Sequence, residues 1–149
     1  MLSQAIFLAL SIVCQITSTE SFKLIDFEAL GGIPETFDEK VAWHNGELMN
    51  TTLGSLKPGE TLVVPNKTFY LMGGVKVVGL NSATFQLDGT LRFSKDIHSW
   101  PRTPLGKLIP AMYFENIANI TFTSSGQGQW DGQVCKSLLK SLRLLYSVV

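Results

Sequence analysis

The sequence contains few of the residues that cross-link a chain or carry acid–base chemistry. Its 149 residues include two cysteines and two histidines. Cys14 lies in an apolar N-terminal run and Cys135 lies near the C-terminus, so removal of the first segment would leave Cys135 without a partner for an internal disulfide. The sequence also lacks a cluster of metal-ligating residue types and a glycine-rich phosphate loop. We therefore expect no metal and no cofactor.

An excess of charge of one sign is missing as well. Twelve Lys and Arg balance twelve Asp and Glu, and charged residues make up 16% of the chain. Binding to nucleic acid by counterion release needs a basic excess, so nucleic acid is not an expected partner. Hydrophobic residues make up 45% of the chain, which at this length predicts one folded domain.

No hydrophobic run is long enough to span a bilayer comfortably. The apolar run over residues 5–14, followed by small polar residues, is typical of a secretory signal peptide, although no Lys or Arg precedes it. We expect residues 1–20 to be removed on secretion; the alternative is a helix anchored in a membrane or buried in the protein. Three Asn-x-Ser/Thr sequons, at Asn50, Asn66 and Asn119, also favour secretion.

A strand and then a helix are predicted in the next part of the chain. Residues 22–26 alternate like a short strand, with Leu24 and Ile25 on opposite faces. Thr36 and Glu39 have the spacing of a capping box, which predicts a helix start there. The helix would then carry Phe37, Val41, His44 and Leu48 on one face. On that face His44 is interpreted as a partly buried helix residue, with a catalytic base as the alternative. Asp38 and Glu39 would lie in the first helical turn, where the helix dipole favours negative charge.

From residue 56 onward, short β-type runs separated by Gly, Pro and Asn predict an all-β architecture. The stretch TFQLDG, residues 84–89, recurs in outline as TFTSSG, residues 121–126. Such a repeat fits a solenoid in which each coil stacks a Phe on the previous coil and turns at a Gly. The same pattern also fits a β-sandwich.

Residues 96–109 are predicted to form a protruding loop, because the prolines of this region prevent a regular strand. His98, Trp100 and Arg102 mix aromatic and polar groups in the way that sugar-binding surfaces do. The alternative is a proline-rich connection that Trp100 packs against the β-region.

This order of segments resembles the N-terminal part of the polygalacturonases, glycoside hydrolase family 28. The resemblance covers roughly residues 22–133, and its most specific piece is GQGQWDG, residues 126–132. That piece is similar to the family's Gly-x-Gly-x-x-Asp-Gly-x-Gly turn, in which Asp131 would have a structural role. The resemblance implies that residues 21–133 form part of a right-handed parallel β-helix with an N-terminal capping helix. It also implies a pectic polysaccharide as partner and an extracellular or cell-wall location.

The chemistry that the resemblance implies is inverting hydrolysis of α-1,4-galacturonan, which needs an acid and separate carboxylates that activate water. The family's Asn-Thr-Asp, Asp-Asp, Gly-His-Gly and Arg-Ile-Lys motifs are all missing from this sequence. We therefore name no catalytic residue, and we expect this chain to be an inactive, truncated member of the family. The alternative is a non-catalytic carbohydrate-binding or decoy β-solenoid.

The resemblance ends after Gln133, where Val134 replaces an expected glycine. Residues 134–149 form a divergent tail with Lys136, Lys140 and Arg143 in one helical sector and leucines in the other. This pattern predicts an amphipathic helix, which could lie on a membrane or in a groove. Altered coding sequence is the preferred explanation of the tail, because the match breaks inside a motif, and a functional helix is the alternative.

Overall fold

The computed structural model describes residues 22–133, which form one helix and nine short strands. The predicted signal peptide (residues 1–20), the divergent tail (residues 134–149) and both cysteines lie outside the described residues. In chain order the elements are β1 (Lys23–Asp26), α1 (Glu39–Ser55), β2 (Glu60–Val64), β3 (Thr68–Leu71), β4 (Val75–Val78), β5 (Thr84–Leu87), β6 (Thr90–Phe93), β7 (Met112–Glu115), β8 (Thr121–Thr123) and β9 (Gln129–Asp131).

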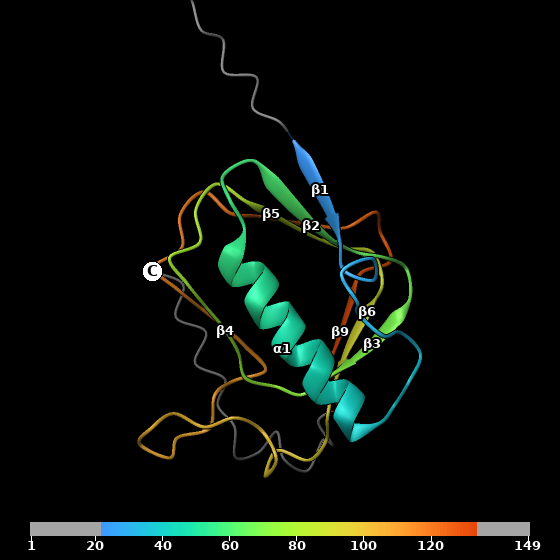
Figure 1. Cartoon of the computed structure of the whole chain (residues 1–149), viewed down its shortest axis with the longest axis vertical. Helices are drawn as coiled ribbons and strands as arrows, with labels where there is room; N and C mark the ends of the chain where they lie inside the picture. Colours follow the sequence, from blue (N-terminus) through green and yellow to red (C-terminus); the bar gives the residue numbers. More distant parts are fainter. Residues whose placement is uncertain (1–21, 134–149) are drawn as a thin grey trace, which may run out of the picture.

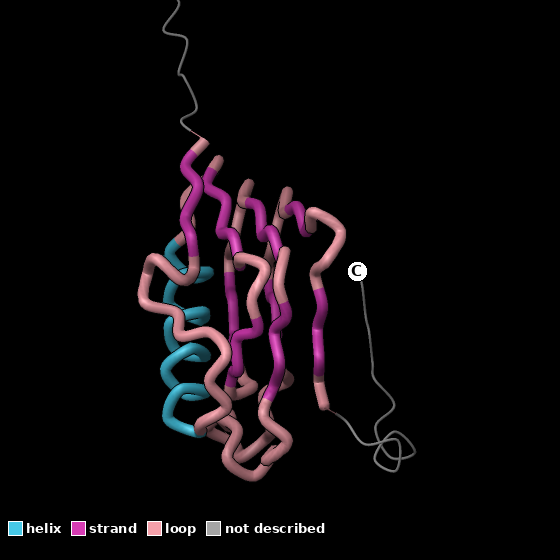
Figure 2. The backbone as a smooth tube through the Cα atoms, turned by 90° about the vertical axis from the view of Figure 1, so that its right-hand side faces the viewer, coloured by secondary structure: helices cyan, strands magenta, loops and turns pink. Residues whose placement is uncertain are grey.

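All the strand pairings between these elements are parallel, and they build three sheets. The sheet orders are β1-β2-β5-β8, β3-β6-β9 and β4-β7. From β2 onward the chain therefore visits the three sheets in turn, and we call each passage a coil (Figure 1). Seen from the side, the coils stack on one another in a row (Figure 2). The predicted predominance of strands is confirmed, and the parallel pairing does not fit the antiparallel β-sandwich alternative.

The predicted repeat is confirmed in register, with one correction. Phe85 pairs with Phe122, and their rings meet edge to face at 6.2 Å between centroids. The glycine, however, was matched wrongly: Thr90 pairs with Gln129, so Gly128 rather than Gly126 takes the place of Gly89 in the next coil. Two extra residues after β8 shift the match, and sequence offset alone does not reveal them.

The position of Gly89 leaves no room for a side chain. A Cβ built there would lie 2.2 Å from the carbonyl oxygens of both Pro65 and Lys67. A Cβ at Gly128 would lie 2.2 Å from the carbonyl oxygen of Leu87. The same corner of two successive coils therefore rests on direct contact between backbones.

The interior between the three sheets and α1 is apolar. Along β2, β3, β5 and β6, buried residues alternate with half-buried ones, as expected of strands with one face inward. The core residues with the largest fully buried side chains are Phe27, Phe69, Phe85, Phe93, Met49 and Leu53.

The helix starts later than the sequence predicted. Asp38 is the N-cap, and its carboxylate accepts hydrogen bonds from the backbone N–H of Lys40 and Val41. Thr36 instead donates its hydroxyl to the carbonyl of Pro34, so the predicted capping box is wrong. A carboxylate is an effective N-cap because it also carries negative charge at the positive end of the helix.

The buried face of α1 also differs from the predicted one. It consists of small, polar and apolar residues: Ala42, Asn45, Gly46, Met49, Thr52 and Leu53. Phe37 lies outside the helix and is 54% exposed, and His44 is exposed, with Nε2 2.9 Å from the Gly31 carbonyl oxygen. The interpretation of His44 as partly buried is therefore wrong.

Small residues let α1 approach the first coil closely. The Met72 N–H donates to the carbonyl of Ala42 at 2.8 Å, and a Cβ on Gly46 would come within 3.1 Å of the Met72 carbonyl oxygen. The helix lies across the end of the stack formed by β3 and β4 (Figures 1 and 2). It thus closes the apolar interior at that end.

Asn45 is a fully buried polar residue that fastens α1 to its surroundings. Its Oδ1 accepts the Ile33 N–H, while its Nδ2 donates to the carbonyls of Ile33 and Tyr70. These bonds satisfy the amide group and connect the segment before α1 to β3. Burial of the amide is therefore stabilising rather than costly.

Candidate functional site

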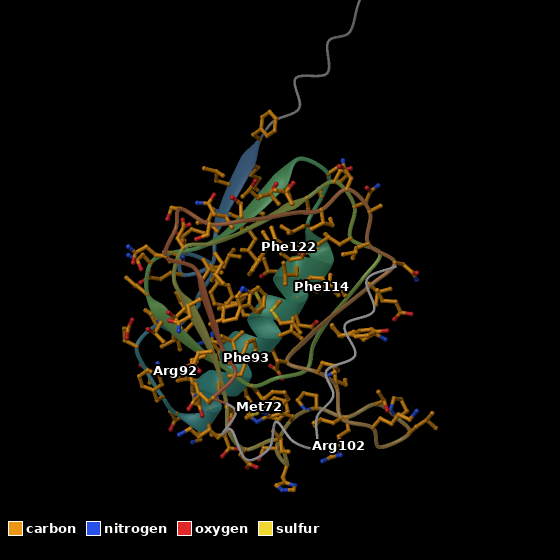
Figure 3. The ribbon with its side chains drawn as sticks, turned by 180° about the vertical axis from the view of Figure 1, so that it is seen from behind. Met72, Arg92, Phe93, Arg102, Phe114 and Phe122 are labelled. Atoms are coloured by element: carbon orange, nitrogen blue, oxygen red, sulfur yellow. The ribbon has the colours of Figure 1, made fainter. Side chains whose placement is uncertain are left out.

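The connection between β6 and β7, residues 94–111, projects from the body of the stack (Figure 3). We call it the hairpin loop. Arg102 and Leu108 form an antiparallel bridge within it, and the Thr103 N–H donates to the Lys107 carbonyl at 2.8 Å. Gly106 closes the turn with a φ of 76°, which favours glycine. The predicted protruding loop is confirmed, and internal hydrogen bonds order its tip.

Trp100 anchors the base of the hairpin loop. Its indole N–H donates to the Ser94 carbonyl at 3.1 Å, and its ring lies 6.4 Å from that of Phe93 between centroids. A Cβ on Gly73 would come within 2.2 Å of the indole, so the ring rests directly on the Gly73 backbone. The interpretation of Trp100 as a packing residue is confirmed, whereas its contact with sugar stays a prediction.

The hairpin loop carries cations that have no carboxylate partner in the described part of the chain. Four cations elsewhere form ion pairs: Lys23–Glu60, Lys67–Glu28, Lys76–Glu115 and Arg92–Asp131. Within residues 22–133, Lys95, Arg102 and Lys107 have no carboxylate oxygen within 4.0 Å. Arg102 instead donates from Nη1 to the Gly106 carbonyl, which leaves its other N–H groups available.

His98 and Arg102 are both exposed on this loop, and Trp100 is half-buried at its base. The structure thus places the three predicted sugar-contact residues on one projection. Sequence reasoning missed Lys95 and Lys107 as members of the same group. For Lys107 the signal was available, because no acidic residue occurs between Asp96 and Glu115, whereas Lys95 directly precedes Asp96.

Asp96 is the acidic residue of the hairpin loop, and its carboxylate is already engaged. It accepts hydrogen bonds from the Ser99 hydroxyl and from the His98 N–H. The bond from Ser99, followed by the one from His98, lowers the pKa of Asp96 below its ordinary value. The carboxylate therefore stays ionised at neutral pH and orders the start of the loop.

The carboxylate of Asp131 connects two successive coils by hydrogen bonds. Its Oδ2 accepts the Arg92 Nε–H at 2.8 Å, and its Oδ1 accepts the Gln133 N–H at 3.0 Å. The Gln133 bond chiefly, and Arg92 after it, lower the pKa of Asp131. A general acid needs a raised pKa to hold a proton at neutral pH, so this shift has the wrong direction for a proton donor.

The carboxylate of Asp88 makes a second connection of this kind between coils. It accepts the Ser125 N–H and the Gln86 side-chain amide, each at 2.6 Å. The bond from the Ser125 backbone, followed by that from Gln86, lowers the pKa of Asp88. Ser125 belongs to the following coil, so this carboxylate also joins successive coils.

The three sequon asparagines are all exposed but differ in surroundings. Asn66 lies between β2 and β3. Asn119 has a φ of 55°, and its Nδ2 donates to the Ser82 hydroxyl at 3.2 Å. Asn50 lies on α1, where its Oδ1 accepts the Lys76 N–H at 3.0 Å. Glycan occupancy at each of them stays a prediction.

Within residues 22–133, no three His, Cys, Asp or Glu side chains converge as a bound metal ion would require. The helix in that range is too short and too polar to cross a bilayer.

No family model, curated protein or solved structure matches this chain in the comparisons with known proteins. The choice of the hairpin loop as the candidate site therefore rests on its structure alone, namely its anchored base and its unpaired cations.

Proposed function

We propose that this chain is a non-catalytic, polygalacturonase-like protein that is secreted and binds pectic polysaccharide. Residues 22–133 would be the first coils of a right-handed parallel β-helix, capped by α1. The succession of three parallel sheets supports this proposal, because strands three apart in sequence stack on one another. The binding partner would be a polymer of galacturonate, which carries one carboxylate on each sugar.

The proposal of a non-catalytic role rests on the residues that are present. The motifs of the resembled family are missing from the sequence. The carboxylate most similar to a family position, Asp131, is held ionised by hydrogen bonds from Gln133 and Arg92. Such a group can position its neighbours but does not supply a proton to a leaving oxygen.

The observation that carries the binding proposal is the set of unpaired cations on the hairpin loop. Arg binds carboxylates through paired N–H groups, and Lys adds a mobile positive charge. Because Trp100 holds the base of the loop against Gly73, these cations are presented on an ordered support. An ordered support lowers the entropic cost of binding.

A charge-removal experiment tests this proposal. Replacing Arg102 and Lys107 together with Ala should weaken binding to polygalacturonate about tenfold or more, since each charge-assisted bond contributes about 1.5–3 kcal/mol at most when well formed. The matched control replaces exposed Lys40 and Lys57, which lie on α1 and just after it. Binding is measured by sedimentation with insoluble polygalacturonate or by calorimetry.

Equal binding by the hairpin-loop variant and by the unmodified protein would contradict the proposed site. Loss of binding in the Lys40/Lys57 control as well would show a general charge effect. A Trp100→Ala variant does not separate these outcomes, because it also removes the anchor of the loop. A reducing-sugar assay on the purified chain tests the non-catalytic role: release of sugar ends above background would contradict it.

A further inference from the structure

A shallow depression lies between α1 and the base of the hairpin loop. Its volume is about 60 Å³, and its lining comes from Trp43, Gly46, Glu47, Asn50, Met72, Gly73, Gly74 and Pro101. One water needs only about 10–15 Å³ of such space, so the depression has room for a group of several heavy atoms. It is the meeting point of a sequon asparagine, an aromatic ring and a carboxylate.

The amide of Asn50 is held in one orientation beside this depression. Its Oδ1 accepts the Lys76 N–H at 3.0 Å, whereas its Nδ2 makes no hydrogen bond to any residue of the described range. In an N-linked glycan the sugar replaces one hydrogen of Nδ2 and leaves Oδ1 as an acceptor. The bond to Lys76 is therefore compatible with the modified side chain.

We propose that Asn50 carries an N-linked glycan whose first N-acetylglucosamine lies over this depression with its N-acetyl group inside, fixing α1 to the base of the hairpin loop. The proposal rests on the secretion part of the proposed function, since glycan transfer needs the secretory pathway. In the transfer, Nδ2 bonds to C1 of the sugar and loses a proton. The C1–oxygen bond to the pyrophosphate of a lipid-linked oligosaccharide donor breaks.

The lining suits the chemistry of this sugar. Trp43, seven residues before Asn50 on α1, is half-buried and lines the depression, where its ring can contact an apolar sugar face. Met72 and Pro101, which also line the depression, supply an apolar part for the methyl of the N-acetyl group. Glu47, one helical turn before Asn50, supplies a carboxylate for sugar hydroxyls.

Neither of the other sequons has such surroundings. Asn66 and Asn119 line neither this depression nor the one bordered by Leu87, Phe122 and Trp130, and Nδ2 of Asn119 already donates to the Ser82 hydroxyl. Glycans at those two positions would extend into solvent. We therefore expect a glycan to stabilise the folded protein at Asn50 and not at Asn66 or Asn119.

The test compares the full chain made in a eukaryotic secretory host with the same chain made in bacteria, which add no such glycan. Peptide mass spectrometry should find Asn50 occupied on the secreted protein. Asn50→Gln should then lower the thermal midpoint by about 3 °C more in the secreted protein than in the bacterial one. Asn66→Gln should give the same midpoint change from both hosts.

A double-mutant cycle with Trp43 separates a seated glycan from a freely extending one. In the Trp43→Ala background the extra effect of Asn50→Gln should vanish, and in Trp43→Phe it should largely return. Trimming the glycan to its first sugar with an endoglycosidase should leave the midpoint unchanged. A secreted protein without glycan at Asn50, or an Asn50→Gln effect equal in both hosts, would overturn the proposal. None of these measurements depends on pectin binding.

Discussion

At the scale of single residues, carboxylates that join coils govern the response to acid. The lowered pKa of Asp131 means that its stabilising contribution is complete above the ordinary Asp value of about 3.9 and is lost as pH falls through its lower folded value. Asp131→Asn should cost less than about 1 kcal/mol at pH 7, because the pair with Arg92 is partly exposed to solvent.

Urea unfolding at several pH values measures this difference. The difference in stability between the variant and the unmodified protein should shrink as pH falls through the lowered folded-state pKa of Asp131. A difference that does not shrink on acidification would mean that geometry rather than charge explains the effect. Asp26→Asn is a suitable control, because Asp26 makes no ion pair with another described residue.

At Gly89 the addition of a single methyl group should strongly destabilise the fold. Gly89→Ala places a methyl group against two carbonyl oxygens, and we expect a loss of about 3 kcal/mol in the free energy of unfolding. The control is Gly54→Ala on α1, where nothing lies within 4 Å of the new methyl. That change should be neutral or stabilise by up to about 1 kcal/mol. The measurement is the denaturant midpoint of each variant and of the unmodified protein. Equal midpoints for Gly89→Ala and the unmodified protein would refute the close-contact explanation.

At the scale of elements, the start of α1 gives a direct test of the corrected cap. Asp38→Ala should lower the free energy of unfolding by about 1 kcal/mol, since it removes the acceptor for two helix N–H groups. Thr36→Ala should change it by less than about 0.5 kcal/mol. Chemical denaturation followed by circular dichroism distinguishes the two, and a larger effect at Thr36 would favour the capping box after all.

The sequence predicted which kinds of element occur better than it predicted their faces. The helix, the short strands and the stacked phenylalanines follow from periodicity and from the repeat. The buried face of α1 does not, because Ala42, Asn45 and Gly46 carry little hydrophobic signal. Asn45 is buried because three backbone groups from distant segments satisfy it, and such partners are known only after folding.

The candidate site could likewise be predicted only in part. A proline-rich loop with His98, Trp100 and Arg102 was expected from residue types alone. The availability of its cations depends on where the carboxylates of other segments lie, such as Glu60 beside Lys23 and Glu115 beside Lys76. That distribution is a tertiary property. The sequence shows the stretch without acidic residues around Lys107, but it does not show how cations elsewhere are paired.

At the scale of the whole molecule, balanced charge makes salt an informative variable. The chain has a net charge of zero, so no overall field draws a polyanion towards it. Binding to polygalacturonate through the few exposed cations of the hairpin loop should therefore weaken steadily with salt, since the Debye length falls from about 10 Å at 0.1 M to about 3 Å at 1 M. Binding isotherms measured over this range provide the check, and affinity independent of salt would indicate apolar contacts with the sugar rings instead.

The hairpin loop enters the chain between β6 and β7 without disturbing the coils on either side. β5 still pairs with β8, and β6 still pairs with β9, although the loop separates them in sequence. The corner after β6 is thus a place where the fold accepts additional chain, anchored by one tryptophan. For protein engineering, this corner is the natural position at which to graft a foreign peptide between residues 102 and 108 and display it on a rigid support.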